Sequence, residues 1–176
     1  MVTCNALAFF ALLLLASPPQ QKTSDPWVAW RFLVGEWTGQ GSGQPGEGTG
    51  SSSFAFDLGG KILVRRNRAD YPATKDRPAV SHEDLLIVYQ ASDGPSARAI
   101  YLDNEGHVIQ YRAQFSEDQK VLTFLSDPAP STSRFRLTYT KGSNGTLTVK
   151  FGIATPGQPD TFSTYVEGVV RRKGPP

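Results

Sequence analysis

The stretch that sets the fold of this chain is Val108-Ile109-Gln110-Tyr111-Arg112-Ala113-Gln114-Phe115. Apolar and polar side chains alternate along it, so that Ile109, Tyr111 and Phe115 share one face and Gln110 and Arg112 share the other. A period of two is typical of a β-strand with one buried face. We therefore predict a strand here, with Tyr111 on its buried side.

The same alternation recurs from residue 52 onward, and turn residues interrupt it at short intervals. Asp93-Gly94, Asn104-Glu105-Gly106 and Asn144-Gly145 are typical of tight connections between neighbouring strands. Connections this short join antiparallel strands, because a parallel pair needs a crossover of a dozen or more residues. The sequence predicts an all-β fold, a closed antiparallel β-barrel of about 9–10 strands, since closure removes exposed strand edges.

Two features precede the first clear strands. Asp25-Pro26 favours a helix start, and Trp27, Trp30 and Leu33 follow at helical spacing. A helix of two or three turns is too short to be stable alone, so we expect it to plug one end of the barrel. Residues 39–53 are rich in Gly and Ser, and we predict a flexible loop there rather than a dinucleotide-binding turn, because no helix pattern follows.

The amino terminus has the features of a signal peptide. Residues 1–17 carry no charged side chain and contain the apolar run Ala6–Leu15, which is too short to span a bilayer. The missing basic residue before this run would also fit a misplaced start codon or a buried N-terminal strand. We expect a signal peptide at 1–17, a linker at 18–25 and a barrel domain at 26–173, exported to the periplasm or the cell exterior.

Charge and cysteine content exclude several classes of function. The net charge of +2 is too small for a dedicated nucleic-acid binder, so no nucleic-acid partner is expected. The single cysteine, Cys4, lies in the expected signal peptide, so the mature domain would have no thiol chemistry. We expect no metal, no cofactor and no integral membrane segment after cleavage, and the sequence leaves the oligomeric state open, a homodimer included.

Gly35-Glu36-Trp37 follows the expected helix, and Arg171-Arg172 ends the last expected strand. This arrangement resembles the calycins, the barrel class of lipocalins and fatty-acid-binding proteins. In that class a G-x-W follows an N-terminal helical turn, and an arginine from the final strand packs over the tryptophan. A guanidinium stacks well on an indole, and strand parity favours Arg172 over Arg171 as the partner of Trp37. The resemblance implies a structural signature of Gly35, Trp37 and Arg172.

Further matches extend the resemblance over residues 26–173 to bacterial lipocalin-like domains of unknown function. They are Leu58-Gly59-Gly60-Lys61-Ile62-Leu63 and Gly168-Val169-Val170-Arg171-Arg172. The resemblance implies a fold and little about a ligand. The start of the domain is also similar to nitrobindin, a barrel whose heme iron is held by a histidine on a late strand. Residues 145–172 contain no histidine, which argues against heme.

Arginines and tyrosines on expected inner faces suggest a ligand site. Alternation from residue 61 to residue 70 would turn Arg66 and Arg68 inward, where a guanidinium is costly unless paired or hydrated. Small calycin barrels use such arginines, with a tyrosine, to hold a ligand carboxylate. Tyr111 and Tyr139 lie on apolar faces, and His107 shares the parity of Tyr111. We expect these five residues to bind the ligand, unless the register is reversed or Arg68 has reached the hydrated rim.

These observations predict an exported barrel that binds a small, hydrophobic or amphipathic molecule with a polar or anionic head. One alternative is a structural or interaction domain with a filled core. Another is a nitrobindin-like heme barrel or an enzyme that uses the barrel as a chamber. A pocket predicts space opposite Arg66 beside Gly39, Gly41, Ala113 and Gly168, whereas a filled core predicts large side chains at every inward position. His82-Glu83-Asp84 is not expected to chelate a metal, because adjacent strand residues point to opposite faces.

Overall fold

Ten antiparallel strands close into one barrel in the computed structural model, which describes residues 25–92, 96–129 and 131–174. Each strand pairs with its neighbours in sequence, and the first pairs with the last. The strands are β1 (Gly35–Gly43), β2 (Gly48–Asp57), β3 (Ile62–Tyr71), β4 (Val80–Gln90), β5 (Ala97–Asp103), β6 (Val108–Phe115), β7 (Val121–Ser126), β8 (Arg134–Lys141), β9 (Thr146–Ala154) and β10 (Ser163–Arg172). The predicted all-β closed barrel is confirmed.

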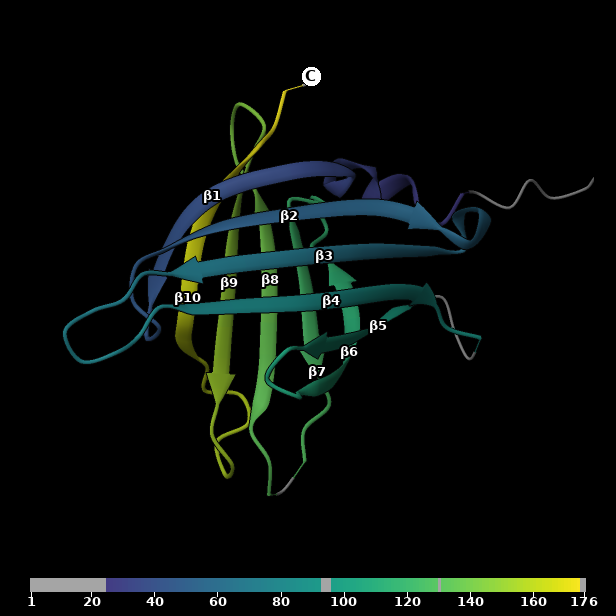
Figure 1. Ribbon diagram of the computed structural model, residues 1–176. Helices are drawn as coiled ribbons and strands as arrows, with labels where there is room; N and C mark the ends of the chain where they lie inside the picture. Colours follow the sequence, from purple (N-terminus) through teal and green to yellow (C-terminus); the bar gives the residue numbers. More distant parts are fainter. Residues whose placement is uncertain (1–24, 93–95, 130, 175–176) are drawn as a thin grey trace, which may run out of the picture.

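Figure 1 shows the barrel flattened into two crossing layers. Strands β1 to β4 run across the front, and β7 to β10 run behind them at a steep angle. The expected signal peptide at 1–17, with Cys4, and most of the linker lie outside the described residues. Within the described residues, no helix is long and apolar enough to cross a membrane.

The N-terminal plug is shorter and more tightly wound than the sequence predicted. It is a single 3₁₀-helix, η1 (Val28–Leu33), and a second short one, η2 (Leu58–Gly60), joins β2 to β3. Trp27, Trp30 and Leu33 are spaced by three, which matches three residues per turn and aligns all three side chains on one face. Each of the three is buried. The ring of Trp30 meets Phe115 edge-on at 5.2 Å between centroids.

The prediction of a loop over residues 39–53 is wrong. Strand β1 extends to Gly43 and β2 begins at Gly48, so only residues 44–47 form a turn. Glycine is needed because β1 passes very close to β10 at this corner of the barrel. A Cβ atom on Gly39 would overlap the backbone oxygen of Val169, and one on Gly41 would lie 2.8 Å from the oxygen of Glu167. Gly39 and Gly41, which we expected beside a pocket, instead allow the backbones of β1 and β10 to approach each other closely.

The half of the barrel next to η1, here called the closed end, is filled with side chains. The largest fully buried side chains there are Phe124, Leu33, Leu63, Leu86, Leu122 and Val88. Side chains in such a core pack at close to crystalline density. This part of the interior therefore matches the filled-core alternative. The opposite end carries the β1–β2, β3–β4, β5–β6, β7–β8 and β9–β10 connections and is here called the open end.

Candidate functional site

The predicted contact between Trp37 and Arg172 is confirmed at the closed end. The two residues are directly paired across β1 and β10, and the guanidinium carbon lies 4.4 Å from the centre of the indole ring. Arg172 also donates hydrogen bonds to the backbone oxygens of Phe32, at 2.6 Å, and Val34. Gly35 has a φ of +120°, and a Cβ atom there would lie 2.6 Å from the Arg172 guanidinium. The signature thus satisfies the carbonyls at the end of η1.

The predicted orientation of β3 is wrong by one residue. Leu63 and Arg65 face the interior, with 0 % and 5 % of their surface exposed, whereas Arg66 is exposed. Both faces of this segment begin with apolar residues, Ile62 and Val64 on one and Leu63 on the other, so local alternation does not distinguish them. The buried arginine of the barrel is therefore Arg65, and neither Arg66 nor Arg68 enters the interior.

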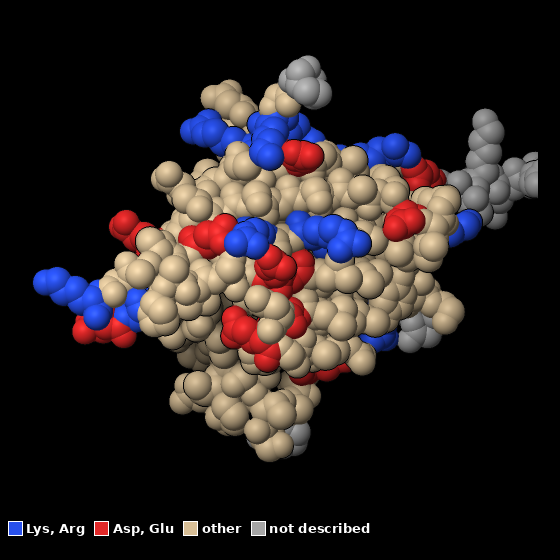
Figure 2. Space-filling view, in the orientation of Figure 1, with Lys and Arg blue, Asp and Glu red and all other residues tan. Residues whose placement is uncertain are grey.

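Arg66 and Arg68 instead lie on the outer surface. Arg68 forms ion pairs with Asp70, at 2.9 Å, and with Glu83, at 2.5 Å. Figure 2 shows such acidic and basic side chains intermingled across the front face. Arg68 also borders a groove of about 1710 Å³ over the outer faces of β10, β1, β2 and β3. Arg66 borders a smaller hollow of about 240 Å³ with Lys173.

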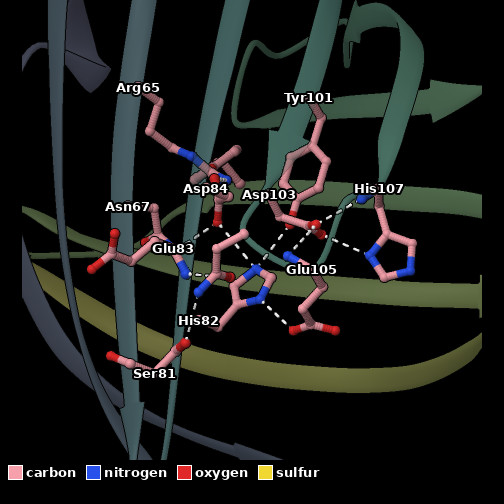
Figure 3. A network of polar contacts seen from close by, with 12 residues as sticks. Arg65, Asn67, Ser81, His82, Glu83, Asp84, Tyr101, Asp103, Glu105 and His107 are labelled. Atoms are coloured by element: carbon pink, nitrogen blue, oxygen red, sulfur yellow. Dashed lines mark hydrogen bonds and ion pairs between the residues drawn. The ribbon is translucent and has the colours of Figure 1, made fainter.

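Inside the barrel, a buried ion pair forms the centre of a polar network, shown in Figure 3. Arg65 donates to Asp84 on β4, and the two side chains are 6 % and 3 % exposed. Arg65 also donates to the hydroxyl of Tyr139 on β8, and Asn67 donates to the second oxygen of Asp84 at 2.8 Å. Burial raises the pKa of Asp84, but the charge of Arg65 and the hydrogen bonds from its neighbours outweigh this and lower the pKa overall.

His82 extends the network toward the open end. Its Nε2 lies 2.9 Å from the Tyr101 hydroxyl and 3.5 Å from Asp84, and its Nδ1 lies 2.9 Å from Glu105. The hydrogen bond to Asp84 raises the pKa of His82, burial lowers it, and Glu105 raises it again, to about 9. His82 is therefore protonated at neutral pH. Both ring nitrogens then act as donors, so the Tyr101 oxygen accepts.

The β5–β6 turn closes the network at the open end. Asp103 accepts from the backbone N–H groups of Glu105 and His107 and lies 2.9 Å from Nδ1 of His107. Asn104 fastens this turn to β4 by donating to the backbone oxygen of Ser81 at 3.0 Å. The His107 side chain is 60 % exposed. The predicted site residue His107 thus lies beside the network but faces solvent.

Tyr111 and Tyr139 face the interior as predicted, and both are 2 % exposed. Each packs edge-on against Phe124, at 6.1 and 6.2 Å between ring centroids. The Tyr111 hydroxyl and Nε of Arg65 are buried, and neither has a hydrogen-bond partner among the described residues. Buried polar atoms are nearly always satisfied, which marks these two as unusual. Burial also raises the pKa of Tyr111, so its hydroxyl remains a donor.

Aromatic rings line the other side of the open end. Phe135 on β8 stacks on Phe151 on β9 at 6.0 Å, and Phe151 meets Tyr165 on β10 at 6.1 Å. All three are half-buried. Burial raises the pKa of Tyr71 at the end of β3; Tyr165 and Glu105 raise this pKa further, and the charge of Arg77 opposes the change. The open end therefore combines an aromatic side with a polar side.

Sequence reasoning placed Tyr111, Tyr139 and His107 near this site, but it missed Arg65, Asn67, His82, Asp84 and Tyr101. One signal was present. His82, Asp84, Leu86 and Val88 are spaced by two and therefore lie on the same face of β4, so two polar residues continue its buried face. A buried carboxylate requires a cation, which the paired strand supplies. Among the described residues, no group of three or more His, Cys, Asp or Glu side chains is arranged to hold a metal ion.

Comparison with known proteins adds evidence on the fold alone. No protein-family model matches the chain, and no curated protein matches it. Among solved structures, the chain is similar to Rv2717c from M. tuberculosis, with 16 % sequence identity and a TM-score of 0.62. The match covers 85 % of this chain and 98 % of that one. The protein therefore shares a barrel fold with Rv2717c, and its function is argued from its own site.

Proposed function

We propose that the protein is a calycin-type barrel that binds a small, largely apolar molecule with a polar head at its open end. The observation that carries this proposal is the buried network around Arg65 and Asp84, inside an otherwise apolar barrel. A buried ion pair adds little net stability compared with well-packed apolar side chains. Perturbed titratable groups clustered at a barrel mouth are typical of binding sites.

The two sides of the open end suit an amphipathic molecule. The stacked rings of Phe135 and Phe151 offer an apolar surface to the body of a ligand, and the network offers hydrogen bonds to its head. The filled closed end restricts such a ligand to the open half. Arg66 and Arg68, on the outer surface, are not part of this proposed site.

Export belongs to the same proposal and rests on residues 1–17. Their uncharged apolar run has the length of a signal-peptide core. N-terminal sequencing of protein from an exporting host should find a start after Ala16 or Ser17. An intact Met1 on a cytoplasmic product would contradict export.

A second candidate function is an interaction domain that uses the outer groove. Its volume of about 1710 Å³ and its border of small residues on β1 and β2 favour this alternative. The groove is open to solvent and far less enclosed than a typical small-molecule site. Its polar side chains, such as Arg68 and Asp70, are already paired with one another.

Native mass spectrometry distinguishes the two candidates. We expect protein from an exporting host to carry a small molecule, and the bound fraction to fall when Asp84→Asn perturbs the interior. The matched control is Asp70→Asn, which makes the same change beside the outer groove. Loss of the bound mass in Asp70→Asn alone would assign binding to the groove, and absence of any bound or bindable small molecule would refute the proposal.

A further inference from the structure

Two buried hydrogen-bond donors in the barrel interior have no partner within the part of the chain that the structure describes. They are the Tyr111 hydroxyl and Nε of Arg65, on residues that are 2 % and 5 % exposed. The two donors are connected through Tyr139. The rings of Tyr111 and Tyr139 both pack against Phe124, and Arg65 donates a hydrogen bond to the Tyr139 hydroxyl. An unpaired buried donor costs free energy, which an acceptor atom would recover. These two donors therefore favour binding of an acceptor.

The charge around these donors indicates which kind of acceptor fits. Arg65 is paired with Asp84, and His82 lies between Asp84 and Glu105. With His82 protonated, two positive and two negative side chains balance. Asp103 adds a further carboxylate nearby, paired with His107. A ligand anion would leave excess negative charge in a region of low dielectric constant, where like charges repel strongly.

Resting on the binding function proposed above, we infer that the head of the ligand is a neutral hydrogen-bond acceptor, such as an amide, ester or ketone carbonyl, held by Tyr111 and Arg65. This narrows the earlier expectation of a polar or anionic head. A carbonyl oxygen accepts from both donors without adding charge. A carboxylate would also lose more hydration on burial than a carbonyl does.

The test compares two probes with the same eight-carbon chain, octanamide and octanoate, by titration calorimetry with the full chain at pH 7. We expect octanamide to bind at least tenfold more tightly than octanoate. In Tyr111→Phe, octanamide should bind about five- to tenfold more weakly, the effect of losing one hydrogen bond. Tyr89→Phe makes the same change on the face of β4 opposite Val88 and should leave binding unaltered.

A second measurement does not depend on a variant. Octanamide labelled with ¹³C at its carbonyl should show a changed carbonyl resonance when bound, because accepting two hydrogen bonds polarises the C=O group. The change should shrink in Tyr111→Phe.

The outcomes separate failure of this inference from failure of the proposed function. Tighter binding of octanoate than octanamide would overturn the neutral head and leave small-molecule binding intact. Octanamide affinity unchanged in Tyr111→Phe, or equally reduced in Tyr89→Phe, would overturn the assignment of the head to Tyr111. No binding of either probe to the wild-type protein would overturn the inference, and absence of a bound mass in the native spectrum would then refute the proposed function as well.

Discussion

Replacing Arg65 by Met should lower the stability of the barrel far more than replacing an exposed arginine does. The change removes the cation from Asp84, whose side chain is 3 % exposed, and leaves that carboxylate with Asn67 and His82. Removing one member of a buried pair costs roughly 3–5 kcal/mol. For a domain of this size each kcal/mol shifts Tm by about 2–4 °C, so Tm should fall by about 6–20 °C.

The assay is urea and thermal unfolding of Arg65→Met, Asp84→Leu and the double variant. The double variant removes both charges and should be much more stable than the sum of the single changes predicts. Arg68→Met is the matched control, because Arg68 is 51 % exposed and ion pairs at the surface contribute little to stability. The reasoning is refuted if Arg65→Met loses no more stability than Arg68→Met.

Three further predictions concern the closed end, pH and heme. Trp37→Ala should destabilise the barrel by about 3–5 kcal/mol in urea unfolding, because the indole is 2 % exposed; a loss of a few tenths would contradict its role at the closed end. The pKa of His82 is raised from 6.5 to about 9, so its stabilising contribution is complete below pH 6.5 and is lost as pH rises through 9. After allowance for solvent screening this amounts to about 1–2 kcal/mol, and His82→Gln should abolish that part of the pH dependence of unfolding. Titration with hemin should give no sharp Soret shift, because both ring nitrogens of His82 are engaged; a tight complex lost in His107→Ala would reverse this expectation.

The features that sequence predicted well are those with local causes. Alternation along residues 108–115 and the short turns predicted antiparallel strands, because a hairpin needs only neighbouring residues to form. The Trp37–Arg172 contact was predictable because the resemblance includes a motif at the first strand and an arginine at the end of the last strand. The path of β1 and β2 was not, because a Gly-rich segment has the composition of a loop. In the structure β1 pairs with β10, more than 100 residues away, whose backbone passes too close to Gly39 and Gly41 to leave room for a side chain there.

The orientation of β3 shows why the site itself was harder to predict. A shift of one residue exchanges the two faces of a strand, and local sequence from residue 61 to residue 70 supports either face. The choice is made by distant partners: Arg65 meets Asp84, 19 positions away, and Tyr139, 74 positions away. The inner face of β4 contains the evidence for that choice. Because Asp84 follows the parity of buried Leu86 and Val88, its carboxylate must be buried, and a buried carboxylate requires a cation on a neighbouring strand. In the register of β3 and β4, Arg65 is placed diagonally to Asp84, whereas Arg66 lies on the other face. The buried carboxylate on β4 therefore selects which face of β3 points inward, a choice that the sequence of β3 alone does not determine.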